Sequence, residues 1–479
     1  MMKEFVEDYL RKHQAYFTKV SEYVFNHPET RFEEYESSSY LANECEKQGF
    51  TVTRNVAGID TAFVATYGSG KPVIGFLGEF DALSGLSQQA GETQYQPLEN
   101  DVGHGCGHNL LGTGSFAAAC AVKCYLEEHQ LPGTVTFFGC PGEEGGSGKT
   151  FMVREGVFDE VDIALTWHPS PSNSIMNRPT LANYQVLFKF KGTAAHAANS
   201  PHLGRSALDA VELMNVGVNY LREHVVDDAR IHYAVTNTGG ISPNVVQSHA
   251  EVLYLVRAAK VEQAENIYQR VHRIAQGAAL MTDTKLTVEF DKACSNYIPN
   301  RNLEEIMHNY LRDIKIEPLT EEEEVFAKAI SDTLTDEERD FTVDLMKGFG
   351  YEGDGSELEG KYVSDSVSDY HATEELLHGS TDVADVSWVV PTAQLTTATS
   401  VLGTPLHTWQ MTTQGLSSIA NKGMLRAAST MALTGLDMLI HEERFQKVQK
   451  EFTAFKEKNP YTCPIPTDVK PSTLSGKAI

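Results

Sequence analysis

The glycine-rich stretch at residues 103–112 contains the densest group of chemically active side chains in the sequence. It holds His104, Cys106 and His108, with glycine on either side of the cysteine. Thiolate and neutral imidazole are both good ligands for borderline divalent metals, so Cys106 and His108 can bind one ion from a single loop. The alternative is a glycine turn with a buried cysteine and a hydrogen-bonded histidine. His104 fits a supporting role better than a ligand role.

A second signal is the pair of adjacent carboxylates, Glu143 and Glu144, which stands between Pro-Gly and Gly-Gly. Beside a metal such a pair can divide the work, because one carboxylate binds the ion while its neighbour accepts a proton from water. On an ordinary surface the pair is merely solvated. Two distant histidines, His168 and His407, are further candidate ligands, although a buried imidazole bonded to the backbone explains each of them equally well alone.

Together these residues predict a site for one or two divalent ions, with Zn and Mn both compatible with the ligand types. Asp81 is expected to orient an imidazole, since metal-bound histidines usually donate their second ring nitrogen to such a group. The alternative makes Cys106 a nucleophile with His108 or His168 as its base. That alternative leaves the glutamate pair unused, so the metal hypothesis is favoured.

Three apolar runs explain how these side chains are expected to meet. Residues 72–78, 134–140 and 161–167 each look like a strand buried on both faces, and each is followed by a carboxylate or histidine named above. In open α/β sheets the active site lies at the carboxyl ends of the strands. The sequence therefore predicts an α/β fold with a mostly parallel sheet flanked by helices, and helices are expected at 3–25, 37–48, 113–126, 303–314, 324–333 and 415–440.

The pattern changes at residue 184, where a β-α-β-β-α-β order begins, as in a split-βαβ (ferredoxin-like) domain. We place this inserted domain at 184–298 and expect 1–183 and 299–479 to form the site-bearing domain. An insertion near 340–380, glycine-rich and acidic over 348–368, is expected to be an extended loop.

Composition excludes several functional classes. With 65 acidic against 39 basic residues and a formal charge of −26, nucleic acid is not an expected partner. No apolar run approaches the ~18 residues needed to span a bilayer, so no membrane association is expected. Seven scattered cysteines in 479 residues are not a disulfide framework. Without a signal-peptide core, the chain is expected to be cytoplasmic.

Five motifs occur in the order found in a known family. They are His-Pro-Glu-Thr-Arg-Phe-Glu-Glu (27–34), Gly-Glu-Phe-Asp-Ala-Leu (78–83), Gly-Cys-Gly-His-Asn (105–109), Pro-Gly-Glu-Glu-Gly-Gly (141–146) and Gly-Thr-Ala-Ala-His-Ala-Ala (192–198). The chain thereby resembles the M20 metallopeptidase family, in particular its amidohydrolases that release amino acids from N-acyl conjugates. The stretch at 145–156 narrows the likeness to members that split p-aminobenzoyl-glutamate into p-aminobenzoate and glutamate. General aminoacylase activity and a co-dependent or regulatory subunit are the alternatives.

The resemblance also implies roles for individual residues and for the inserted domain. Metal ligands are implied at Cys106, His108, Glu144, His168 and His407. Glu143 falls at the general base, and His196 at the histidine that steadies the oxyanion, often across a dimer. Asn244 and Arg257 match contacts to the substrate carboxylate, although a salt bridge inside the inserted domain is an alternative for Arg257. The inserted domain is implied to be a lid and dimerisation domain, in a homodimer or in a heteromer with a related M20 subunit. One departure is Glu79-Phe80-Asp81 where many members have His-x-Asp, which leaves open whether one ion or two are held.

Overall fold

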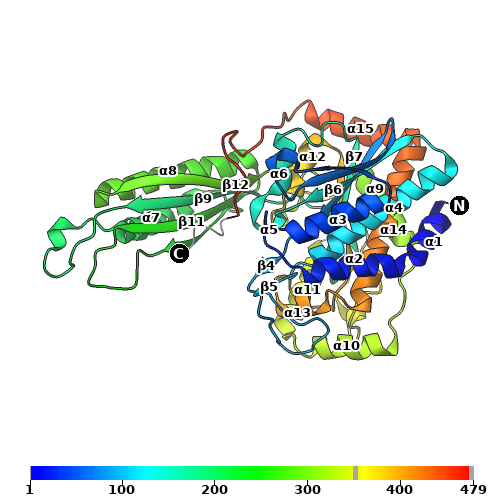
Figure 1. Ribbon diagram of the computed structural model, residues 1–479, viewed down its shortest axis with the longest axis horizontal. Helices are drawn as coiled ribbons and strands as arrows, with labels where there is room; N and C mark the ends of the chain where they lie inside the picture. The colour runs from blue at the N-terminus through cyan, green and yellow to red at the C-terminus, as the bar shows by residue number, and fades with distance from the viewer. Residues whose placement is uncertain (1, 349–353, 474–479) are drawn as a thin grey trace. The chain divides into compact units, whose positions relative to one another are not determined.

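The computed structural model describes residues 2–348 and 354–473, which divide into two compact units (Figure 1). The first unit comprises Met1–Arg178, Ile298–Glu375 and Val386–Thr462. The second comprises Pro179–Tyr297, Leu376–Asp385 and the segment that begins at Cys463. The metal-ligand candidates all fall in the first unit.

The first unit is built on a seven-stranded sheet in the order β1-β2-β6-β3-β7-β13-β8. Its strands are β1 (Thr51–Arg54), β2 (Phe63–Ser69), β6 (Gly133–Cys140), β3 (Val73–Glu79), β7 (Ile163–Ser170), β13 (Thr392–Ala398) and β8 (Ser174–Ile175). The four strands β6, β3, β7 and β13 are parallel, whereas the strands at the two edges are antiparallel. This confirms the predicted α/β fold with its mostly parallel sheet. A short pair, β4 (Leu83–Ser84) and β5 (Val102–Gly103), lies outside this sheet.

The register of the parallel strands brings the predicted strand ends together. Glu79 at the end of β3 is paired with Cys140 at the end of β6, and His168 in β7 is paired with Thr396 in β13. Strand β7 is longer than predicted, because it continues through His168 to Ser170. His168 therefore projects from the last residues of the strand itself, and not from a loop behind it.

Two long helices cover the central strands. Helix α4 (His108–His129) and helix α14 (Ser418–Ile440) pack against each other and against β3 and β7 (Figure 1). The sequence predicts α4 only from residue 113, but the helix begins at His108, so this side chain is held by helical backbone. The approach is close: a Cβ added to Gly114 would lie 2.7 Å from the indole nitrogen of Trp167.

The other helices of the chain surround this core, and one prediction about them is wrong. The expected helix over 3–25 is two helices, α1 (Met2–Lys12) and α2 (Gln14–Asn26), because the backbone leaves helical geometry at His13. The remaining α-helices that do not belong to the second unit's fold are α3 (Tyr35–Lys47), α5 (Glu143–Gly146), α6 (Gly148–Arg154), α9 (Arg301–Asp313), α10 (Glu321–Ser331), α11 (Asp336–Gly348), α12 (Val383–Val389), α13 (Trp409–Gln414) and α15 (Glu442–Lys456). None of the helices within 2–348 and 354–473 has both the length and the apolar character needed to cross a membrane.

The region predicted as an insertion is only partly an extended loop. Helix α11 occupies its beginning up to Gly348, and a short 3₁₀ helix, η4, covers Ser356–Leu358. Residues 349–353, at the centre of this prediction, lie outside the described residues.

The second unit contains the β-α-β-β-α-β order that the sequence predicts. Its elements are β9 (Ala182–Lys191), α7 (Ala207–Leu221), β10 (Arg230–Asn237), β11 (His249–Ala258), α8 (Val261–Thr282) and β12 (Lys285–Cys294). The strands form an antiparallel sheet in the order β10-β11-β9-β12. Helices α7 and α8 pack against each other and against this sheet, so they cover the same face of it.

A buried carboxyl in α9 makes the stability of the first unit depend on pH. Burial raises the pKa of Glu304 from 4.5 to about 8, although Arg301 and Tyr370 donate hydrogen bonds to it. Between these two pH values the folded chain keeps a proton that the unfolded chain has lost. The free energy of unfolding therefore falls as pH rises across this window. We expect Glu304→Gln, measured by chemical denaturation between pH 5 and pH 8, to flatten that dependence. An unchanged slope would contradict this assignment.

Candidate metal centre

The loop that holds Cys106 joins helix α4 through a left-handed glycine. Gly107 has φ of +77° and stands immediately before the first helical residue, His108. Side chains rarely adopt this backbone conformation, and a Cβ here would also lie 3.0 Å from Pro169. The glycine therefore lets the chain turn directly into the helix, with Cys106 and His108 on either side of the turn.

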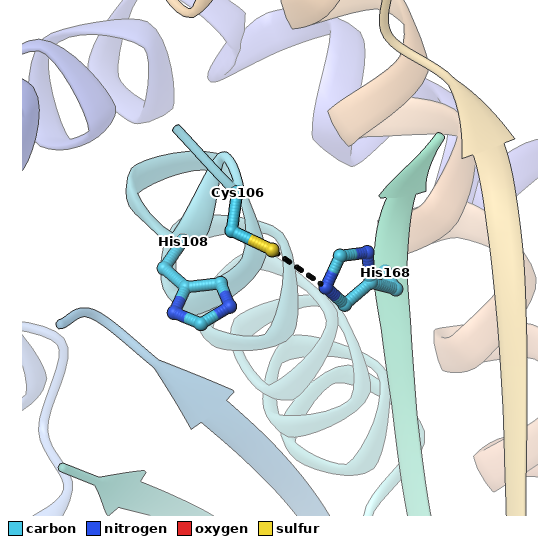
Figure 2. Close-up of side chains that lie close together, drawn as sticks. All are labelled: Cys106, His108 and His168. Atoms are coloured by element: carbon cyan, nitrogen blue, oxygen red, sulfur yellow. Dashed lines mark hydrogen bonds between the residues drawn. The ribbon is translucent and has the colours of Figure 1, made fainter. Parts of the chain in front are cut away.

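Cys106 faces the end of strand β7. Its Sγ lies 3.4 Å from Nε2 of His168, and Figure 2 shows the thiol directed at that ring with His108 beside it. Nδ1 of His168 donates to the Pro169 carbonyl at 2.8 Å. This bond fixes the tautomer and leaves Nε2, the nitrogen next to the sulfur, with its lone pair available.

Glu144 and His407 complete the group. Oε2 of Glu144 lies 3.3 Å from Nε2 of His407, and Oε1 lies 4.0 Å from Nε2 of His108. The backbone of His407, at φ of +61°, donates from its N–H to the Gly105 carbonyl at 2.9 Å, which joins the distant loop to the Cys106 loop. The side chain of His407 is 52% exposed, so the group opens to solvent at this residue.

The structure thus brings all five predicted ligands together. Candidate ligand atoms within 4.8 Å of one another form two overlapping groups that share Cys106: one adds His108 and His168, and the other adds Glu144 and His407. Sulfur, imidazole and carboxylate from four separate chain segments converge on a space small enough for one or two ions.

Asp81 supports two of these side chains from behind. Its Oδ1 accepts a hydrogen bond from Nδ1 of His108 at 2.9 Å, and its Oδ2 accepts one from the backbone N–H of Glu144 at 2.9 Å. The bond to Nδ1 turns Nε2 of His108 toward the other ligands. The geometry is that of a carboxylate orienting a ligand histidine, as the sequence predicts.

The protonation of the group reflects burial and mutual charge. Burial lowers the pKa of His168 to about 4, which keeps this imidazole neutral. Burial alone would lower the pKa of His108, but the charge and hydrogen bond of Asp81 raise it well above its ordinary value. Burial would likewise raise the pKa of Glu144, yet the hydrogen bond from His407 and the charge of His108 lower it to about 2.

These properties fit a divalent metal. Nε2 of His108 and Oε1 of Glu144 are buried and have no hydrogen-bond partner among the residues that the structure describes. Orphaned buried polar atoms are costly, and two of them aimed at a thiol and a neutral imidazole form an incomplete coordination sphere. The nucleophile alternative is not favoured, because burial raises the pKa of the Cys106 thiol, whereas a nucleophilic cysteine needs a lowered one.

A buried ion pair that the sequence analysis did not predict adjoins the centre. Lys149, in α6, is completely buried, and its Nζ lies 2.7 Å from Oε1 of Glu79. Oε2 of Glu79 lies 3.3 Å from Nε2 of His108. The sequence revealed Glu79 only as a missing imidazole. A lysine in the apolar stretch that follows Glu144 was the available signal for its counter-charge.

Replacing Lys149 with methionine is expected to destabilise the protein by about 3–5 kcal/mol, because the Glu79 carboxylate would remain buried without this cation. The double variant Glu79→Gln/Lys149→Met removes both charges and should recover most of that loss. Chemical denaturation of the two single variants and the double variant measures the coupling. Equal losses in Lys149→Met and the double variant would show that the two charges are independent.

The loop that carries Glu143 is positioned by a second residue that sequence reasoning missed. Glu34 is buried, and its Oε1 accepts hydrogen bonds from the backbone N–H of Gly142 at 2.9 Å and of Phe32 at 2.8 Å. Burial raises the pKa of Glu34 well above its ordinary value, and the charge of Asp81 adds to this. Gly142 fixes the start of α5, so the Glu143 carboxylate lies close to His108 and Glu79.

The three remaining predicted residues lie in the second unit. His196 is exposed in part, and its Nδ1 accepts hydrogen bonds from the backbone N–H groups of Ala198 and Asn199 at 3.2 and 3.1 Å. The carbonyl of Asn244 accepts a bond from the N–H of Ala197, which places Asn244 beside the His196 loop. Arg257, in β11, contacts the Ser380 hydroxyl at 3.3 Å and forms no ion pair within the described chain, so the salt bridge considered for it is not observed.

Comparisons with known proteins agree with this architecture. Residues 75–353 match the model of peptidase family M20/M25/M40. Over 477 residues the chain is 53% identical to the second, or B-type, chain of the p-aminobenzoyl-glutamate hydrolase of Escherichia coli (strain K12), and the alignment covers 98% of both chains.

Two solved structures share the fold. One is an aminobenzoyl-glutamate utilization protein from Klebsiella pneumoniae, with a TM-score of 0.59 and 17% identity over 90% of this chain and 98% of that one. The other is a Bacillus subtilis M20 peptidase described as dinuclear and metal-binding, with a TM-score of 0.54 and 15% identity over 90% of this chain and 99% of that one. The family match and the near-complete alignment to the Escherichia coli hydrolase chain show that this chain is a hydrolase of peptidase family M20/M25/M40.

Proposed function

We propose that this protein is a metal-dependent amidohydrolase that cleaves p-aminobenzoyl-glutamate into p-aminobenzoate and glutamate. The observation that carries the proposal is the convergence of Cys106, His108, Glu144, His168 and His407 in one unit. The 53% identity to an enzyme named for this substrate supports the choice of substrate.

We assign the divalent ion, Zn or Mn, to these five side chains, with room for one ion or two. When bound, such an ion polarises the scissile carbonyl and acidifies water. Cys106 must lose its proton to act as a ligand, and His108 must be neutral. The orphaned Nε2 of His108 and Oε1 of Glu144 are the atoms that we expect to gain most from metal binding.

In this proposal Glu143 moves the proton. Its carboxylate accepts a proton from the attacking water and returns it to the leaving amide nitrogen, so that the amide bond breaks with a neutral amine as the leaving group. Glu143 adjoins the proposed ligand Glu144 on the same short helix, which keeps the base within reach of the water without making it a ligand.

For the second unit we propose the role of a lid and dimerisation domain over 184–298, with 1–183 and 299–479 as the metal-binding domain. Because Nδ1 of His196 accepts two backbone hydrogen bonds, its Nε2 carries the proton and can donate to a developing oxyanion. Asn244 and Arg257 are assigned to the glutamate carboxylates, and the planar guanidinium fork of Arg257 suits bidentate binding.

The Escherichia coli relative is named as one subunit of its hydrolase, which supports assembly of this chain with a related M20 chain. A homodimer is the alternative assembly. Cytoplasmic location is proposed as well, because no disulfide joins the cysteines of the described chain. An aminoacylase of broader range is the second candidate function.

The test is a panel assay of the purified metal-loaded chain, alone and mixed with its related subunit. p-Aminobenzoyl-glutamate, acetyl-glutamate and benzoyl-glutamate are offered at equal concentration. We expect the aroyl-glutamates to be hydrolysed much faster than acetyl-glutamate. Equal rates would support the aminoacylase, and no activity without the second subunit would show dependence on it. Absence of hydrolysis in both preparations would overturn the proposal.

A further inference from the structure

A cavity of about 390 Å³ in the first unit lies apart from the metal centre in its lining, since it shares no residue with that centre. It is enclosed by α1, by the segment between α9 and α10, by α14 and by the end of β13. Its volume is within the range of small-molecule sites. Neither the proposed function nor the sequence motifs account for it.

A nearly buried arginine, Arg426 of α14, lines this cavity. The residue is 7% exposed, and its Nη2 donates to the Leu311 carbonyl at 3.0 Å. Nε and Nη1 are buried and have no hydrogen-bond partner within the described residues, where Arg426 also forms no ion pair. Burial lowers the pKa of Arg426 to about 10, and the side chain still carries its charge at neutral pH.

An uncompensated buried guanidinium is unusual, because buried charges are normally paired. The protein is strongly acidic overall, so a partner carboxylate would have been readily available to this position. The missing counter-charge is the observation that points to a ligand which supplies negative charge.

The rest of the lining specifies the size and charge of that ligand. Two other cations of the lining are already paired, Arg11 with Asp8 and Lys422 with Glu323. Arg426 is thus the buried charge that remains to be balanced, which fits a monoanion better than a dianion. Lys315 at the rim can add attraction without being buried.

The cavity walls are largely apolar. Leu10, Ile314, Leu319, Val363 and Ile419 line it. Inorganic anions would leave these walls in contact with water, whereas an organic acid would cover them with its hydrocarbon part. Charge and walls together favour a carboxylate attached to a compact apolar body.

We propose that this cavity is a binding site for a small organic monocarboxylate, with the carboxylate on Arg426 and the apolar body against Leu319 and Ile419. Carboxylate oxygens accept the hydrogen bonds that the guanidinium lacks, as in other arginine–carboxylate pairs. The site is independent of the metal centre and of its substrate.

The test is calorimetric titration of the metal-loaded chain with benzoate, the simplest aromatic carboxylate, and with inorganic phosphate. Wild type should bind benzoate, and Arg426→Met should bind it at least tenfold more weakly. Arg257→Met serves as the control for binding at the substrate site, and this variant should retain the tight benzoate site. Phosphate should bind weakly and without dependence on Arg426.

A stability measurement separates a binding role from a structural one. Without benzoate, Arg426→Met should unfold at the same temperature as wild type or higher, because an apolar side chain replaces a buried charge. Benzoate should raise the unfolding temperature of wild type but not of this variant. If Arg426→Met does not fold, Lys315→Glu at the exposed rim provides the second variant, and it should weaken benzoate binding.

Three results would overturn the proposal. Benzoate binding that survives in both Arg426→Met and Lys315→Glu would place the ligand elsewhere. Binding lost only in Arg257→Met would assign it to the substrate site. Failure of wild type to bind benzoate, or equal Arg426-dependent binding of phosphate, would refute the apolar carboxylate as the occupant.

Discussion

Replacing Glu143 with glutamine is expected to lower kcat for p-aminobenzoyl-glutamate by about 10²–10⁴, the usual contribution of a positioned general base. Glutamine keeps the size of the side chain but cannot accept the proton of the attacking water. The hydrogen bonds that shape the loop come from Glu34 and Asp81 to the backbone of Gly142 and Glu144, so the substitution leaves them in place. Fold and metal content should therefore be those of the wild type.

The matched control is Glu144→Gln, which changes the neighbouring carboxylate in the same helix. It should lose metal as well as activity, because Glu144 lies against His407 and His108 in the ligand group. Metal content by mass spectrometry and turnover by substrate absorbance distinguish the two variants. Near-normal turnover in Glu143→Gln would refute the base assignment, and identical metal loss in both variants would make Glu143 a ligand.

The second large effect is expected at Asp81. Asp81→Asn should weaken metal binding by about 10–100-fold, the usual effect of removing the group that orients a ligand histidine. The carboxylate holds both Nδ1 of His108 and the backbone N–H of Glu144, so its loss misaligns two ligands together. Competition titration with a chromophoric chelator measures the change in affinity.

Asp162→Asn is the control for this experiment. Asp162 also accepts a backbone hydrogen bond, from Val73 at 2.7 Å, but at the opposite end of strand β3. It should cost some stability and leave metal affinity unchanged. If Asp81→Asn binds metal as tightly as wild type, then His108 does not depend on Asp81 for its orientation, and the account of the ligand geometry is wrong.

Much of this site could be predicted because its residues form short local motifs. Cys106 and His108 are separated by a single glycine, and Glu143 is adjacent to Glu144. His168 could be placed because an apolar strand of a parallel sheet ends there, and such strands converge at one edge. The distant His407 could also be predicted, since the family resemblance supplied its position in a turn with no periodicity of its own.

The parts that escaped prediction depend on tertiary contacts. Lys149 resembles any lysine at a helix start, and only the fold reveals that it is buried against Glu79. Arg426 lies in a long apolar helix, where the sequence does not show whether a carboxylate meets it. The break between α1 and α2 at His13 was missed because the apolar spacing continues across it without proline or glycine. Helix α11 was missed because its acidic sequence lacks a clear apolar stripe.

The most direct test of the metal centre is removal and return of the ion. The purified protein is stripped with a chelator and titrated with Zn or Mn, while bound metal and p-aminobenzoyl-glutamate hydrolysis are measured on the same samples, with the related subunit present. The account predicts that activity disappears with the ion and returns in proportion to metal bound, and that Cys106→Ala and His168→Ala fail to reload. Full activity in the stripped protein, or normal reloading in both variants, would contradict it.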